Sequence, residues 1–322
     1  MRREQRATIL DVAARAGVHA ATVSRTINVP EKVAPETRRR VEAAVRELGF
    51  VPNRAARGLI TGRTGNVAVI VPDITNPHFA SLVRSVERSA RQSDLQVLLV
   101  DTGEHPDEEV RAAESLSGEV DGFIVVSPRR LHRALHALGS APAVFVNRPV
   151  RQHASILLLT APAVADALQH LAGLGHTRLA YLGGPSGSWA AGERRNAVRS
   201  TGGTSGLEVV ELSVSEPTFE ATAMVVPEIV ASGVSAVLAF NDQMALGVVA
   251  GMNSRGISVP RDLSVVGFDD VPMAAMVAPP LTTISLPTDE VGAVAVAMLS
   301  DGPSTKELFG ELVLRHSTAR AT

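Results

Sequence analysis

The sequence contains no cysteine. Disulfide bonds, thiolate zinc sites and cysteine nucleophiles are therefore excluded. It also lacks a charge-free apolar run of about 18 residues, the length that a membrane-spanning helix needs. The first residues, MRREQRATILDVAARAG, are too polar for a secretory signal. We therefore expect a cytoplasmic protein that does not enter a membrane.

Charge is distributed unevenly along the chain. The formal net charge is only −2 over 322 residues, from 31 Lys and Arg and 33 Asp and Glu. Residues 1–63 hold 13 of these basic residues and 6 of the acidic ones, a balance of +7, so the remaining 18 and 27 give −9. The length and the 45% hydrophobic content predict a globular protein of at least two domains. The charge difference indicates that only the first domain meets a polyanion.

Three short helical patterns follow one another in the basic segment. Thr8 can cap a first helix that ends before Gly17, and Pro35 opens a third that Gly49 ends. The helix between them has a small, polar and cationic face formed by Ala21, Ser24, Arg25 and Asn28. Two helices joined by a glycine turn and braced by a third predict a helix-turn-helix unit, whose second helix enters the DNA major groove. An ordinary three-helix bundle is the alternative that the pattern leaves open.

The segment from Thr8 to Leu59 closely resembles the DNA-binding head of the lactose/galactose repressor family of bacterial transcriptional regulators. The motifs that carry this resemblance are DVAARAGV, TVSRTIN, VAPETRRRV and LGFVPNRAARGL. The resemblance implies base-reading roles for Ala20, Ala21 and Arg25. It implies that the residues facing phosphates are Thr8, Thr22, Ser24, Asn28 and Asn53. Arg25 suits its role because a guanidinium group can donate two hydrogen bonds to guanine.

Residues 52–59, PNRAARGL, resemble the hinge helix of the same family. The resemblance implies that two hinges pair in a dimer and enter the minor groove, with Arg54 and Ala56 at the DNA and Leu59 wedged into the central base step. Without the resemblance, Leu59 would be an ordinary apolar linker residue. His19 and Ala34 stand where the family usually has serine, and we expect these two changes to weaken phosphate contacts or shift the operator preference.

From residue 67 onward, apolar runs alternate with helical stretches. The predicted strands are residues 67–71, 95–100, 123–126, 143–146, 156–159, 178–182, 236–240 and 263–268. Unbroken apolar strands separated by helices are typical of parallel sheets with both faces covered. Eight such strands predict two sheets rather than one.

Short polar residues and glycines follow most of these strands, at the edge where open α/β sheets bind ligands. They are Asp73, Asp101, Ser127, Asn147, Arg148, Gly183, Gly184, Asn241, Asp242, Asp269 and Asp270. Carboxylates and amides suit ligands rich in hydroxyl groups. The same residue types are also frequent in ordinary turns and helix caps, so both interpretations stay open.

The family resemblance extends more weakly over the rest of the chain. DITNPHFASLVRSVE, LAGLGHTRLAYLGG, AVLAFNDQMALGVV and LSVVGFDDVP resemble the family's effector-binding core, which is similar to periplasmic sugar-binding proteins. The implied fold is an N-terminal all-α helix-turn-helix head followed by a two-lobed, periplasmic-binding-protein-like α/β core. The expected divisions are a head at 1–50, a hinge and linker at 51–64, a first lobe at 65–159 and 288–310, and a second lobe at 160–287 and 311–322.

By position, the resemblance implies five effector-binding residues. Phe79 would stack on the ligand, and Arg194 would anchor it from the far lobe. The residues that would bond its hydroxyl groups are Asn147, Asn241 and Asp269. Three departures from the family pattern in the expected cleft are Asn147 for aspartate, Leu286 for glutamine, and Val214 near an aromatic position. They favour a ligand other than a standard hexose.

The function expected from the sequence is that of a transcriptional regulator, with a repressor favoured. Its expected partners are double-stranded operator DNA with a pseudo-palindromic sequence, a small polar effector such as a sugar or related metabolite, and a second copy of the chain, as a homodimer or within a tetramer. A protein partner, or a nucleoside or purine-type ligand, is the alternative within the family. A binding protein without an operator is less favoured because the motifs TVSRTIN and VPNRAARGL resemble the DNA-binding head of the family. An enzyme is less favoured because neither a nucleophile–base pair nor a metal-binding set is evident. No metal and no cofactor is expected.

Overall fold

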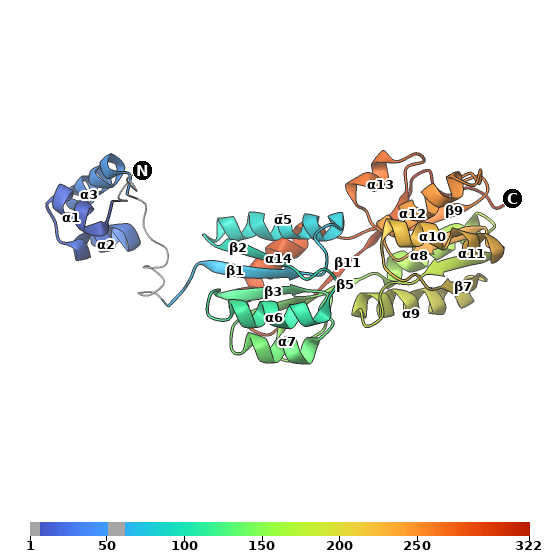
Figure 1. Ribbon diagram of the computed structural model, residues 1–322, viewed down its shortest axis with the longest axis horizontal. Helices are drawn as coiled ribbons and strands as arrows, with labels where there is room; N and C mark the ends of the chain where they lie inside the picture. Colours follow the sequence, from blue (N-terminus) through green and yellow to red (C-terminus); the bar gives the residue numbers. More distant parts are fainter. Residues whose placement is uncertain (1–6, 51–61) are drawn as a thin grey trace. The chain divides into compact units, whose positions relative to one another are not determined.

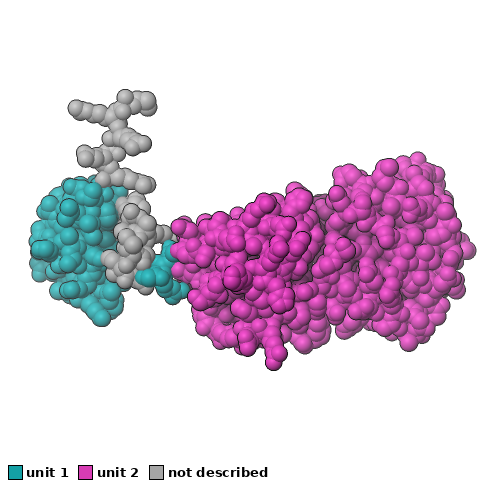
Figure 2. Space-filling view, turned by 60° about the horizontal axis from the view of Figure 1, so that its bottom comes forward, with its two compact units in different colours: residues 1–65 teal, residues 66–322 magenta. Residues whose placement is uncertain are grey.

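The computed structural model describes residues 7–50 and 62–322 of the chain. Two compact units make up the chain, residues 1–65 and residues 66–322, coloured separately in Figure 2. Within the described ranges, no helix combines the length and the hydrophobicity that crossing a membrane requires.

The first unit contains three short α-helices. They are α1 (Ile9–Ala16), α2 (Ala20–Asn28) and α3 (Pro35–Leu48), with a 3-10 turn, η1 (Pro30–Lys32), before α3. A reciprocal cap starts α1: Thr8 Oγ1 accepts a hydrogen bond from the Asp11 amide at 3.3 Å, and the Asp11 carboxylate accepts one from the Thr8 amide at 2.8 Å. Gly17 ends α1 with a φ of +62°, a conformation that glycine adopts without strain.

The three helices share one small core. Val12, Val23 and Val41, one from each helix, are fully buried and belong to the same cluster. This arrangement confirms the predicted helix-turn-helix fold. Neither α2 nor α3 has a side-chain cap, because His19 and Ala34 at the capping positions accept no hydrogen bond from the first turn.

Lobe 1 of the second unit is built on a parallel six-stranded sheet, in the order β11-β5-β4-β3-β1-β2. The strands are β1 (Asn66–Val71), β2 (Gln96–Asp101), β3 (Gly122–Val126), β4 (Ala143–Val146), β5 (Ala154–Leu159) and β11 (Thr305–Phe309). The helices are α5 (Pro77–Gln92), α6 (Pro106–Leu116), α7 (Leu131–Leu138) and α14 (Thr288–Asp301). Helices α5 and α14 pack on one face of the sheet, and α6 and α7 pack on the other (Figure 1).

Lobe 2 is built on a second six-stranded sheet, in the order β12-β10-β9-β8-β6-β7, in which only β12 is antiparallel. The strands are β6 (Arg178–Leu182), β7 (Glu208–Leu212), β8 (Ala236–Ala239), β9 (Ser264–Asp269), β10 (Thr282–Ser285) and β12 (Glu311–Val313). The helices are α8 (Ala161–Gly173), α9 (Trp189–Thr204), α10 (Phe219–Met224), α11 (Val226–Ala231), α12 (Asp242–Asn253) and α13 (Pro272–Met276). Helices α8 and α9 cover one face and α10, α11 and α12 the other.

The polypeptide passes between the lobes three times: from β5 to α8, from β10 to α14, and from β11 to β12. The two parallel α/β sheets confirm the predicted fold class. Four strands were missed from the sequence, namely β7, β10, β11 and β12. Three of them are edge strands, and all four contain charged or hydroxyl-bearing residues, so none is the unbroken apolar run of a central strand.

Candidate functional sites

The outward face of α2 is the first candidate site. Ala21, Arg25 and Asn28 are exposed, and Ser24 is half-buried. The side chain of Arg25 makes no hydrogen bond and no ion pair with any described residue. Asn28, by contrast, makes a hydrogen bond within α2, because its Nδ2 donates to the Ser24 carbonyl at 2.9 Å. The face thus presents one unpaired cation among small side chains, which is the chemistry that major-groove reading requires.

The other residues predicted to touch DNA are placed less uniformly. Thr8 is exposed but serves as the cap of α1, and Ala20 and Thr22 are half-buried in the first turn of α2. The predicted hinge residues lie outside the described residues: Asn53, Arg54, Ala56 and Leu59.

In the Arg38-Arg39-Arg40 run of α3, Arg38 and Arg40 make different kinds of contact. Arg38 forms an exposed ion pair with Glu42 at 2.6 Å. Arg40 reaches back to α1 and donates to the Ala16 carbonyl at 2.6 Å and the Gly17 carbonyl at 2.9 Å. It therefore satisfies carbonyl groups at the negative end of α1, a structural role that its position in a basic run does not reveal.

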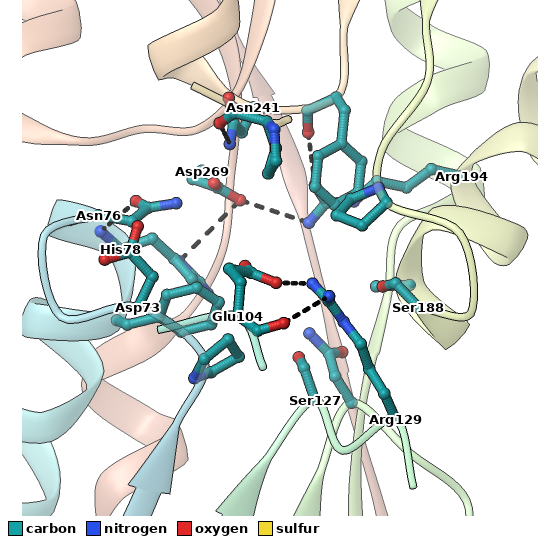
Figure 3. Close-up of a pocket in the computed structure, with 17 residues that line it drawn as sticks. Asp73, Asn76, His78, Glu104, Ser127, Arg129, Ser188, Arg194, Asn241 and Asp269 are labelled. Carbon is teal, nitrogen blue, oxygen red and sulfur yellow. Dashed lines mark hydrogen bonds and ion pairs between the residues drawn. The ribbon is translucent and has the colours of Figure 1, made fainter. Parts of the chain in front are cut away.

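A cleft between the two lobes is the second candidate site (Figure 3). It encloses about 580 Å³ of space, counted to its open mouth, and contacts both sheets at the carboxyl ends of their strands. The five predicted effector residues all line it: Phe79, Asn147, Arg194, Asn241 and Asp269. Five further lining residues carry polar side chains that the sequence analysis did not single out: Asn76, His78, Glu104, Arg129 and Ser188.

Arg194 of α9 is the most constrained of the lining side chains. It is 5% exposed, and it donates to the Phe240 carbonyl at 2.5 Å and to Asp269 Oδ1 at 3.3 Å. Its guanidinium carbon lies 3.5 Å from the centre of the Phe268 ring and 4.6 Å from that of Phe240. Burial lowers its pKa, and the Asp269 carboxylate partly offsets this effect. The aromatic rings and the carboxylate hold the cation in one orientation, with Nε left without a partner.

The two predicted asparagines already make hydrogen bonds within the protein. Asn241 caps α12, since its Oδ1 accepts from the Met244 amide at 2.8 Å, and its Nδ2 donates to the Pro217 carbonyl at 3.1 Å. Asn147 Oδ1 accepts from the Leu158 amide at 3.4 Å. A ligand at these residues would therefore share their amide groups with the backbone.

Backbone conformation is unusual around the cleft. Glu104, Ser127, Asn147 and Asp269 all have a positive φ, of +63°, +50°, +59° and +102°, and all four line the cleft. Non-glycine residues adopt such angles uncommonly, and they concentrate where a side chain must be aimed at a functional site. Nothing in a local sequence pattern indicates this clustering.

Glu104 and Arg129, from the loops that follow β2 and β3, form an ion pair in lobe 1. Arg129 also donates to the Glu104 main-chain carbonyl at 3.2 Å, and its own amide donates to the buried carboxylate of Glu109 at 3.1 Å. Burial lowers the pKa of Arg129. Both cations that line the cleft are therefore matched by a carboxylate, Arg129 by Glu104 and Arg194 by Asp269.

His78 lies beside Phe79 at the start of α5, with ring centres 5.1 Å apart. Its side chain is buried, and its Nδ1 is 4.0 Å from Asp269 Oδ1. Burial lowers the pKa of His78, an effect that Asp269 opposes and Arg194 reinforces. The imidazole is thus neutral at neutral pH.

Two residues that the family resemblance places in the cleft are not among its lining residues. Leu286 is buried in the main hydrophobic core, and Val214 packs against the core of lobe 2. Leu286 is 5% exposed, whereas Val214 is half-buried, and neither departure from the family pattern changes a residue that lines this cleft.

Asp242, which follows Asn241, is buried behind the cleft-lining residues. Its carboxyl oxygens accept from Thr283 Oγ1 at 2.6 Å and from the Val271 amide at 2.8 Å. Burial, together with the neighbouring Asp269 carboxylate, raises the pKa of Asp242 to about 8. In the part of the chain that the structure describes, no group of three histidine or acidic side chains is arranged to hold a metal ion.

Comparison with known proteins gives matches at both candidate sites. Residues 8–53 match the family described as bacterial regulatory proteins, lacI family, and residues 168–318 match the periplasmic binding protein-like domain. The transcriptional regulator CelR of Thermobifida fusca is 35% identical over 318 residues, which cover 94% of this chain and 93% of that protein.

Solved structures resemble the chain over almost its whole length. A lac repressor dimer bound to operator and the anti-inducer ONPF is 27% identical, with a TM-score of 0.88 and coverage of 98% of this chain and 100% of that one. A complex of the transcriptional regulator CelR with cellobiose is 31% identical, with a TM-score of 0.71 and coverage of 97% and 100%.

Proposed function

The chain belongs to the lacI family of bacterial regulatory proteins and is a DNA-binding transcriptional regulator, and on this premise we propose that it acts as a dimeric repressor whose operator binding is controlled by a small, polar, sugar-like effector. The observation that carries the proposal is the exposed face of α2 in a helix-turn-helix head, where the Arg25 side chain has no partner among the described residues. An unpaired arginine on a surface of small residues is ready to bind a guanine edge.

Operator reading is assigned to α2. Arg25 supplies two donors for one guanine, while Ala20 and Ala21 allow close approach and can contact a thymine methyl group. Thr8, Thr22, Ser24 and Asn28 face the flanking phosphates. A single head reads too few base pairs for selectivity, whereas a two-fold dimer reads two half-sites one helical turn apart. The operator is therefore a pseudo-palindrome.

Effector control is assigned to the cleft. The ligand contacts both lobes, through Phe79 and Asn147 of lobe 1 and through Arg194, Asn241 and Asp269 of lobe 2. A ligand changes operator affinity only if it binds one arrangement of the lobes better than another. The CelR complex contains cellobiose, a sugar, which supports the same ligand class here.

Operator binding is tested by selecting duplexes from a pool randomised over about two helical turns. We expect the wild-type chain to enrich a pseudo-palindrome, and we expect Arg25→Ala to bind the enriched duplex at least about 10-fold more weakly, the loss expected for one bidentate base contact. Arg38→Ala is the matched control, since Arg38 is an exposed helical arginine already paired with Glu42. Equal losses for both variants would indicate general charge attraction rather than base reading.

Effector binding is tested by thermal unfolding in the presence of sugars, polyols, nucleosides and sugar phosphates. A ligand at 100 times its dissociation constant stabilises the folded chain by about 2.7 kcal/mol. For a unit of this size, that corresponds to roughly 5–10 °C in the unfolding midpoint. Absence of a shift with every sugar and polyol would reject the proposed effector class while leaving operator binding intact.

A further inference from the structure

Two buried polar groups face each other across the cleft without a direct hydrogen bond. His78 belongs to α5 of lobe 1, and Asp269 ends β9 of lobe 2 (Figure 3). Their side chains are each only 5% exposed, and Nδ1 of His78 lies 4.0 Å from Oδ1 of Asp269. This distance exceeds that of a hydrogen bond between the two groups.

His78 Nδ1 is left without a hydrogen-bond partner among the described residues, although it is buried. The residue is firmly placed, because its amide donates to Asn76 Oδ1 at 3.0 Å and its ring packs edge-on against Phe79. On the other side, Asp269 Oδ1 is held by Arg194 at 3.3 Å. An unsatisfied buried nitrogen is rare in folded proteins and indicates a place for a further polar atom.

The charges around the cleft restrict what that atom can belong to. The two lining cations, Arg129 and Arg194, are each paired with a carboxylate. Asp73 adds a carboxylate that is bonded by Thr75 and pairs with no cation among the described residues. With a neutral imidazole at His78, the lining carries an excess of negative charge, which disfavours an anionic ligand.

The chemistry of the two residues suits a hydroxyl group. The carboxylate of Asp269 favours the tautomer in which Nδ1 of His78 carries the proton, so Nδ1 donates and Asp269 accepts. A hydroxyl oxygen can lie about 2.8 Å from both atoms, accepting from one and donating to the other. A phosphate or carboxylate oxygen has no proton to donate and would be repelled by Asp269.

We propose that one hydroxyl group of the effector bridges His78 of lobe 1 and Asp269 of lobe 2, and that this bridge makes the cleft select an uncharged hydroxylated ligand over its phosphorylated or carboxylated forms. The proposal rests on the cleft being the effector site. Because the bridged residues belong to opposite lobes, the hydroxyl group stabilises the lobe arrangement in which they approach each other. His78 is thereby a specificity-determining residue.

The test uses the full chain and the fluorescence of Trp189, the only tryptophan of the sequence. Trp189 begins α9 between Ser188 and Ala190, both of which line the cleft. The neutral probes are D-ribose, D-glucose and cellobiose. The charged probes are D-ribose 5-phosphate, the counterpart of D-ribose, and D-glucose 6-phosphate and D-gluconate, both counterparts of D-glucose. The neutral sugar that binds most tightly is then replaced by its monodeoxy analogues.

Two variants separate a hydrogen-bonding role from a packing role. His78→Asn keeps a polar group near the position of Nδ1, and His78→Phe keeps the ring but no polar atom. For the wild type we expect one monodeoxy analogue to bind at least about 10-fold more weakly than the parent sugar. This difference should become clearly smaller in His78→Phe, where only Asp269 still contacts the hydroxyl group, and be largely retained in His78→Asn. Thermal unfolding without ligand verifies that both variants are folded.

The possible results are distinct. If His78→Phe discriminates among the deoxy analogues as the wild type does, His78 does not read a hydroxyl group and the proposal is overturned. If a phosphorylated sugar binds more tightly than its parent, the neutral-ligand part is overturned while the effector site stands. If no neutral or charged probe binds, the proposed sugar effector is itself rejected, and this inference with it.

Discussion

Replacement of Arg194 by methionine should destabilise lobe 2 strongly and should be partly rescued by a second change at Asp269. Methionine preserves most of the length and apolar contact of the arginine stem against Phe268 and Phe240. It removes the bond to the Phe240 carbonyl and the 3.3 Å contact with Asp269. The substitution therefore leaves the Asp269 carboxylate, on a side chain that is 5% exposed, without its cation.

The expected loss of stability is large because a buried charge without a partner destabilises the folded state more than the removal of both charges does. Removing one partner of a buried ion pair destabilises by about 3–5 kcal/mol. In Arg194→Met combined with Asp269→Asn the unpaired charge is gone, so the double variant should be more stable than the sum of the single losses predicts. Coupling of about 2–3 kcal/mol is expected for residues in direct contact.

Urea unfolding followed by Trp189 fluorescence measures this coupling locally, since Trp189 and Arg194 lie on the same helix, α9. Arg199→Met is the matched control, because Arg199 is exposed on that helix and pairs with Glu211 at the surface. We expect the control to leave the midpoint almost unchanged. Additive losses for Arg194→Met and Asp269→Asn, or a loss below about 1 kcal/mol for Arg194→Met, would refute the reasoning.

Three further predictions follow from packing, backbone conformation and ionisation. Gly292→Ala would place a Cβ 2.2 Å from Ser85 Oγ and 2.3 Å from the Ser85 carbonyl carbon. It should therefore destabilise the folded chain at the α5–α14 contact by about 1–3 kcal/mol. Calorimetry measures this loss, and an unchanged unfolding midpoint would contradict the close approach of the two helices. Gly17→Ala puts a side chain at a φ of +62°, which should destabilise the head by about 1–2 kcal/mol. Amide hydrogen exchange in residues 9–48 should become faster, and unchanged exchange would contradict the expected strain at this position. Folding raises the pKa of the Asp242 carboxyl group to about 8. Its contribution to the free energy of unfolding is therefore complete below about pH 4 and is lost between about pH 4 and pH 8. Asp242→Asn should remove this part of the pH dependence of the urea midpoint, and an unaltered profile would show that Asp242 ionises normally.

The sequence by itself determined the elements whose signals are local. Turn glycines, caps and helical spacing located the three head helices, because these signals are set by residues within one turn of each other. Continuous apolar runs located most of the central strands of both sheets, because strands covered on both faces are rich in apolar residues. The central strand β10 was missed because three of its four residues, in the sequence TTIS, carry hydroxyl groups. Edge strands such as β7 and β11 escaped this reading, since one side of an edge strand contacts solvent and tolerates charge.

The cleft was only partly readable from the sequence. The family resemblance named five residues that the fold brings to one cleft, which is possible because the carboxyl ends of parallel strands meet at the same edge of a sheet. It also placed Val214 and Leu286 there, whereas Leu286 belongs to the main hydrophobic core and Val214 packs against the core of lobe 2.

Only the tertiary structure decided how the polar groups of the cleft pair. Glu104 meets Arg129 across two loops, and His78 meets Asp269 across two lobes, over separations of 25 and 191 residues in the chain. No local pattern encodes such contacts. The first depends on how the strands of lobe 1 are ordered in their sheet, and the second on where three crossings of the chain place one lobe against the other. The same packing leaves His78 neutral and Asp242 protonated, since burial, and not residue type, sets which ionisation state survives.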